Sequence, residues 1–85
     1  MQTINVTVKR WYNLGNTYHT VQAGGIKSDI TYGYGDAWTM TLCDLLAEKG
    51  IAPKREGNRA PLQWLRDNGI EVNEIVYDVK RKRDL

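Results

Sequence analysis

The sequence predicts a small α+β domain with the element order β-β-β-α-α-β. Three observations predict this class: period-two alternation over residues 3–12, turn signals at 13–16 and 24–25, and helical patterns over 37–49 and 61–68. The chain has 85 residues, of which 41% are apolar and 26% charged, which is the size and composition of one globular domain. We expect residues 1–79 to form that domain and residues 80–85 to form a short basic C-terminal tail.

The first three strands, at 3–12, 17–23 and 26–32, are expected to form an antiparallel meander. Each of the two turns fixes a register, and the two registers agree on which face of the sheet is apolar. That face carries Val6, Val8, Val21, Ala23, Ile26 and Ile30. The opposite face is polar except for Trp11 and Tyr18, which lie directly opposite each other in the predicted register.

Two helices are expected to cover the apolar face. Asp36 suits the N-cap of the helix at 37–49, and Gly50 suits the position just after its end. Pro61 suits the first turn of the second helix, at 61–68.

The last strand is expected at residues 70–79, beside the first strand and antiparallel to it. Its apolar residues change parity along the strand, since Ile70 and Val72 share one parity and Ile75 and Tyr77 share the other. We expect a β-bulge near Asn73 to reconcile them.

Charge and composition exclude several classes of protein. Twelve Lys and Arg against ten Asp and Glu give a net charge of +2, too small for nucleic-acid binding by electrostatics alone. No apolar run approaches the roughly 18 residues of a membrane span, and the N-terminus lacks a secretory signal. The single cysteine forbids an internal disulfide, which favours a reducing cytoplasm.

The candidate catalytic residues are too few for an enzyme. Cys43 falls inside a predicted helix and His19 on the apolar face of a predicted strand, so both are interpreted as packing residues. One Cys and one His cannot supply a zinc site, and we expect no metal and no cofactor. The run from Tyr32 to Asp36 lacks the Lys-Ser/Thr ending of a phosphate-binding loop, although its two glycines could display Tyr34 to a partner.

Two motifs resemble those of small uncharacterised phage-encoded proteins. They are Gly15-Asn16-Thr17-Tyr18-His19, at the predicted hairpin, and Tyr32-Gly33-Tyr34-Gly35-Asp36, at the junction between strand and helix. The resemblance covers about the first 50 residues, where Leu45-Leu46 and Gly50 also belong to it. It implies a viral accessory protein in the host cytoplasm and carries no activity to transfer.

Three hypotheses for function follow. The first is a non-enzymatic protein, monomer or homodimer, that binds and blocks a host protein or nucleoprotein complex, by analogy with anti-defence and anti-CRISPR proteins. Its expected partner-binding residues are Lys9, Trp11, Tyr18, Lys27, Tyr34, Asp36, Asp44 and Glu48. The alternative is a single-stranded nucleic-acid-binding module that uses Trp11, Tyr18, Arg81 and Arg83. The third is a virion assembly protein that self-associates through the open edge of the third strand.

Overall fold

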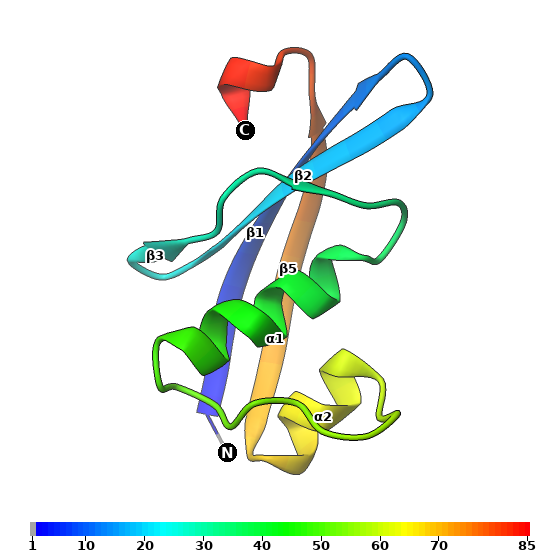
Figure 1. Cartoon of the computed structure of the whole chain (residues 1–85). Helices are drawn as coiled ribbons and strands as arrows, with labels where there is room; N and C mark the ends of the chain where they lie inside the picture. The colour runs from blue at the N-terminus through cyan, green and yellow to red at the C-terminus, as the bar shows by residue number, and fades with distance from the viewer. Residues whose placement is uncertain (1) are drawn as a thin grey trace.

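The computed structural model describes residues 2–85 and has the predicted α+β class, with two helices packed on a mixed sheet (Figure 1). In chain order the elements are β1 (Gln2–Asn13), β2 (Asn16–Ala23), β3 (Ile26–Lys27), β4 (Thr31–Tyr32), α1 (Trp38–Glu48), α2 (Pro61–Asp67), β5 (Ile70–Val79) and a short 3-10 turn, η1 (Lys82–Asp84). The strand order is β3-β2-β1-β5, and β4 also pairs with β2.

The β1–β2 hairpin has the predicted register. Val8 lies opposite Val21, and Trp11 lies opposite Tyr18. The turn is tight: Leu14 and Gly15 both have positive φ, at 50° and 82°, the backbone that a two-residue hairpin turn requires. The predicted alternation of buried and exposed residues along β1 is therefore confirmed at its centre.

The expected third strand, 26–32, is interrupted. Ile26 pairs with Ala23 as predicted, but after Lys27 the ladder breaks, and the Ser28 side chain accepts a hydrogen bond from the Val21 backbone N–H at 2.9 Å. Pairing resumes in β4 one residue out of the expected register, so Tyr32 lies opposite Tyr18 rather than Thr17. The prediction that Ile30 is buried is wrong: it lies in the interruption and is 45% exposed.

β5 pairs with β1 as predicted, but the two strands are parallel, and the expected antiparallel pairing is wrong. The reason is the path of α1, which brings the chain back to the end of the sheet where β1 begins (Figure 1). Because β5 starts at the same end as β1, the two strands run in the same direction. The expected bulge near Asn73 is also wrong, because the ladder runs without interruption from Ile70 to Val79. Ile75 and Tyr77 instead lie on the face of the sheet that the helices leave open.

Both helices are present close to their predicted bounds. The prediction that the Asp36 carboxylate caps α1 is wrong: no side chain caps this helix, and Asp36 contributes its main-chain oxygen, which accepts bonds from the Thr39 N–H and hydroxyl. The end of α1 is as predicted, with Gly50 at φ 72°. The Gly50 and Ile51 N–H groups bond back to carbonyls of the last turn, the usual glycine-terminated helix end.

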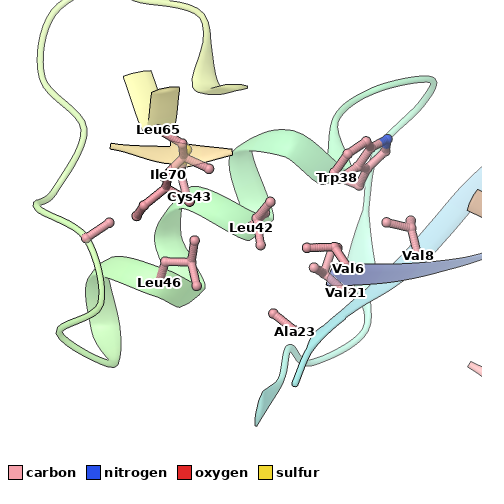
Figure 2. Packing of buried hydrophobic residues seen from close by; sticks show 11 residues of the cluster. Val6, Val8, Val21, Ala23, Trp38, Leu42, Cys43, Leu46, Leu65 and Ile70 are labelled. Atoms are coloured by element: carbon pink, nitrogen blue, oxygen red, sulfur yellow. The ribbon is translucent and has the colours of Figure 1, made fainter. Parts of the chain in front are cut away.

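The core lies between the sheet and the helices. Figure 2 shows Leu42 of α1 directed toward Val6 and Val21 of the sheet, and Cys43 beside Leu65 of α2. Leu42 and Leu65 are fully buried, and burial of a leucine side chain contributes about 1.5–3 kcal/mol. This core fixes the side of the sheet on which the helices sit and so determines which side chains face outward.

Candidate functional site

The open face of the sheet is the face that the helices do not cover. It carries the odd-numbered residues of β1 and β5 and the even-numbered residues of β2, because paired residues share a face. Besides Gln22, Glu71 and Val79, its large side chains are Lys9, Trp11, Tyr18, Lys27, Ile75 and Tyr77. Four of these six, Lys9, Trp11, Tyr18 and Lys27, are residues that the sequence predicts as a partner-binding surface.

Four aromatic rings form a continuous row at one end of this face. The row consists of Trp11, Tyr18, Tyr32 and Tyr34, and neighbouring ring centroids lie 5.6, 5.5 and 5.5 Å apart. The Trp11–Tyr18 contact is tilted and the other two are edge-to-face, the geometry that aromatic pairs favour. Trp11 and Tyr18 are half-buried, whereas Tyr32 and Tyr34 are each 53% exposed.

Hydrogen bonds hold the far end of the row in place. The Tyr34 hydroxyl donates to the Gly15 carbonyl at 2.8 Å, and the Tyr32 hydroxyl lies 2.9 Å from the Tyr34 hydroxyl. The hydrogen bond shared with the Tyr32 hydroxyl raises the pKa of Tyr34 above its ordinary value of 10, so this phenol is neutral at pH 7. Tyr34 is therefore tied to the tip of the β1–β2 hairpin rather than presented on a free loop.

The C-terminal tail, residues 80–85, crosses the open face beside the aromatic row. It leaves the end of β5 and reaches the opposite edge, where the Lys27 ammonium donates to the Leu85 main-chain oxygen at 2.9 Å (Figure 1). Leu85 is 9% exposed. The tail is thus packed on the sheet, and its position fixes where its four consecutive cations, Lys80 to Arg83, lie.

Two clefts lie between parts of the tail and the sheet. One, of about 520 Å³, is lined by Trp11, Asn13, Tyr18, Ile30, Tyr32 and Lys82. The other, of about 600 Å³, is lined by Lys9, Tyr77, Val79, Lys80, Arg81, Arg83, Asp84 and Leu85. The first cleft is lined by three aromatic rings and one cation. The second is lined by four cations and one acidic side chain.

The acidic residues predicted for partner binding lie elsewhere. Asp36 is exposed in the turn before α1, and Asp44 and Glu48 lie on the outer side of α1. Asp44 and Glu48 share a groove of about 390 Å³ with Lys27 and Lys49, at the β3 edge of the sheet. The eight predicted residues therefore fall into the open face, this groove and the isolated Asp36.

One ring of the aromatic row, Tyr32, and the cation beside that row, Lys82, are missing from the residues that the sequence predicts for binding. The predicted register places Tyr32 on the apolar face, because the slip in register after Lys27 leaves no mark in the pattern of apolar residues. The signal that could have predicted its position is the spacing between Tyr32 and Tyr34, because residues two apart in an extended segment lie on the same side. Lys82 is the other residue, and in the sequence it is only one member of a basic run.

His19 and Cys43 each have a structural partner, in agreement with their interpretation as packing residues. His19 is 2% exposed, and its Nε2 lies 2.7 Å from the Thr41 hydroxyl. The Cys43 thiol donates to the Pro61 carbonyl at 3.3 Å, and burial raises its pKa to about 11, so it is a neutral thiol at pH 7. Within residues 2–85, no group of three or more His, Cys, Asp or Glu side chains is placed to hold a metal ion.

Neither a membrane-spanning helix nor a known relative indicates the function. None of the helices described between residues 2 and 85 has the length and apolar character to cross a membrane. No family model matches the sequence, and no curated protein or solved structure matches the chain. The open face of the sheet is therefore the feature from which a function is proposed.

Proposed function

We propose that this protein is a non-enzymatic binding protein that holds single-stranded nucleic acid on its open sheet face. The observation that carries the proposal is the aromatic row of Trp11, Tyr18, Tyr32 and Tyr34 lying beside the cations of the tail. Single strands are held in this way by many binding proteins, with bases stacked on aromatic rings and phosphates beside Lys and Arg.

The arrangement of charge favours single-stranded nucleic acid, whose phosphates are negatively charged, over an uncharged ligand. The overall charge is only +2, but Lys80 to Arg83 are concentrated where the tail crosses the sheet, close to Lys9. The carboxylate of Asp78 points to the other face, where it pairs with Arg10 at 3.1 Å. The local surface is therefore more basic than the net charge indicates.

Ring exposure supports stacking at the outer end of the row. Tyr32 and Tyr34 are anchored by hydrogen bonds through their hydroxyls, yet more than half of each residue remains exposed. A fixed, exposed ring loses little conformational entropy when a base stacks on it. Trp11 and Tyr18 provide a larger, half-buried platform next to the cleft that contains Lys82.

The direct test is a fluorescence anisotropy titration with labelled oligo-dT and oligo-U of about 12 nucleotides, which spans the site size of a small single-strand-binding domain. Trp11→Ala should weaken binding by about fivefold to a hundredfold, since each base stacked on an aromatic ring contributes about 1–3 kcal/mol. Tyr12→Ala is the matched control, because Tyr12 is the next residue of β1, is 69% exposed and lies on the other face. Equal losses in the two variants, or no binding by the unmodified protein at about 50 mM salt, would contradict the proposal.

The contribution of the tail is tested by salt dependence. Replacement of Arg81 and Arg83 by Gln should weaken binding to all sequences alike and reduce the slope of log affinity against log salt by about 0.7 for each phosphate that these arginines neutralise. The control is Arg66→Gln, on the exposed side of α2. A slope that is unchanged in the tail variant would exclude these arginines from the contact surface.

A second candidate is the binding and blocking of a host protein, the function expected by analogy for a viral accessory protein of this size. The observation that favours it is the groove at the β3 edge, which brings together Lys27, Asp44 and Glu48, three of the residues predicted for a protein partner. A pull-down from bacterial lysate with and without nuclease separates the two candidates. A discrete protein retained after nuclease, and absent with Asp44→Lys, supports the second candidate; partners released by nuclease support the first.

A further inference from the structure

The two edges of the sheet differ in how much backbone they leave unpaired. On one edge, β3 has two residues and β4 has two, with the Ser28 interruption between them. On the other edge, β5 runs for ten residues, Ile70–Val79, in unbroken register with β1. No strand among residues 2–85 pairs with the outer side of β5. A straight edge of this length presents a row of free N–H and C=O groups to another strand.

We propose that two copies of this chain pair through β5, antiparallel across a two-fold axis, to form one continuous sheet. The distribution of charge along the strand selects a second copy as the partner. Glu71 and Glu74 lie in the first half of β5, and Lys80 and Arg81 directly follow its end. Both cations lie in the bend where the chain leaves the end of the strand. Antiparallel pairing places the acidic half of each copy beside the basic end of the other.

The pairing register follows from the pleat and from like-charge repulsion. Residues that face each other across the axis must have the same parity, because both copies present the same face of the sheet on the same side. A register centred on Glu74 would place two carboxylates in contact, and one centred on Val76 would place Glu74 against Asp78. A register centred on Ile75 avoids both.

The Ile75 register also covers apolar surface. Ile75 is 67% exposed on the open face, and in the dimer it would contact the same residue of the second copy. Tyr77, 43% exposed, would lie opposite Asn73 of the second copy. Glu71 would lie opposite Val79 and close to Lys80 and Arg81, which follow Val79 in the bend after β5. This dimer is independent of nucleic-acid binding, although it would place two aromatic rows on one face of one sheet.

Engineered disulfides test both the dimer and its register. Ile75→Cys should form an intermolecular disulfide under mild oxidation, because residues directly opposite in an antiparallel pair have Cα atoms about 4.5–5.5 Å apart. Asn73→Cys is the matched control, since it lies two residues away on the same face and should not cross-link with itself. A mixture of Asn73→Cys and Tyr77→Cys should cross-link between the two variants. The natural Cys43 is 3% exposed and does not compete.

Sedimentation velocity measures the association without added thiols. The unmodified chain should dimerise with rising concentration, and Glu71→Lys should weaken the dimer on the order of tenfold by bringing like charges together. Combining Glu71→Lys with Arg81→Glu should restore much of the affinity. A monomer up to several hundred micromolar, or equal cross-linking at positions 73 and 75, would overturn the proposal.

Discussion

The two faces of this sheet are made by alternate residues of the same strands, yet one face packs against the helices and the other is left open. The covered face holds Val6, Val8 and Val21, each at most 2% exposed, against the helices. The open face holds the aromatic row, in which Tyr32 and Tyr34 are each 53% exposed. Residues that fix the fold and residues available to a ligand are thus interleaved in sequence but separated in space.

The difference lies also in how each face is assembled. The covered face follows from regular alternation and helix periodicity alone. The aromatic row depends on irregular features: the slip in register before β4, the close packing of Gly33, and the hydrogen bond from Tyr34 to Gly15. It follows that substitutions on the covered face should act on stability, and that substitutions on the open face should act mainly on the oligonucleotide binding proposed above.

The largest expected effect is on the covered face. Leu42→Ala should lower the free energy of unfolding by about 2–5 kcal/mol, because it leaves a cavity at a fully buried position. A domain of this size has a total stability of roughly 5 kcal/mol, so the variant should be largely unfolded in mild denaturant. Urea titration followed by circular dichroism measures it. Met40→Ala, on the same helix but 50% exposed, should change stability by less than about 0.5 kcal/mol.

The next effect is expected where the two faces meet, at Gly33. A Cβ at this position would lie 2.6 Å from the Ala37 Cβ and 3.5 Å from the His19 ring, so the backbone between β4 and α1 must move. Gly33→Ala should therefore cost about 1–3 kcal/mol and also displace Tyr34, which near-ultraviolet circular dichroism would report. Gly25→Ala is the control, since a Cβ there meets nothing within 4 Å. Similar losses at both glycines would show that close packing is not the cause.

How much of this can be predicted from sequence depends on the kind of feature. Hairpin registers and helix bounds are predictable, because turn residues and apolar periodicity act locally. The slip at Ser28 is not, because its cause is a single hydroxyl that replaces a backbone partner. The direction of β5 depends on the end of the sheet at which α1 leaves the chain, which the sequence pattern does not show. The exposed apolar residues of β5, such as Ile75, therefore suggest a β-bulge that the strand does not have. Charged residues in the tail give no indication that Leu85 is buried.

A smaller loss of stability is expected from the aromatic row. Tyr18 contacts Trp11 on one side and Tyr32 on the other, so Tyr18→Ala should lower the free energy of unfolding by about 1 kcal/mol. The same variant should lose most of its oligonucleotide binding, which separates the two roles of the face. If Tyr18→Ala instead destabilised the protein as much as Leu42→Ala, the row would belong to the core, and the contrast between the faces would disappear.

The smallest effect on stability is expected from His19, which follows Tyr18 in the chain and lies on the covered face. Burial lowers the pKa of His19 below its ordinary value of 6.5, and a hydrogen bond to the Gly33 backbone partly opposes this shift. The folded state therefore binds less proton than the unfolded state, so stability is complete above pH 6.5 and falls as the pH drops from 6.5 through the lowered pKa. His19 is the single histidine of the chain, and Asp67, whose pKa is lowered from 3.8 by its hydrogen bond with Arg59, titrates below this window.

Urea titrations at several pH values between about 8 and 5 should show this decline in the unmodified protein. In His19→Gln the free energy of unfolding should be nearly independent of pH over the same range, whatever the absolute cost of the substitution. Gln is the matched replacement because its amide can still hydrogen-bond to the Thr41 hydroxyl, which His19 contacts at 2.7 Å. If the decline persisted in this variant, the pH dependence would come from carboxylates. The protonation of His19 would then contribute no more to stability than the neighbouring valines, which do not titrate.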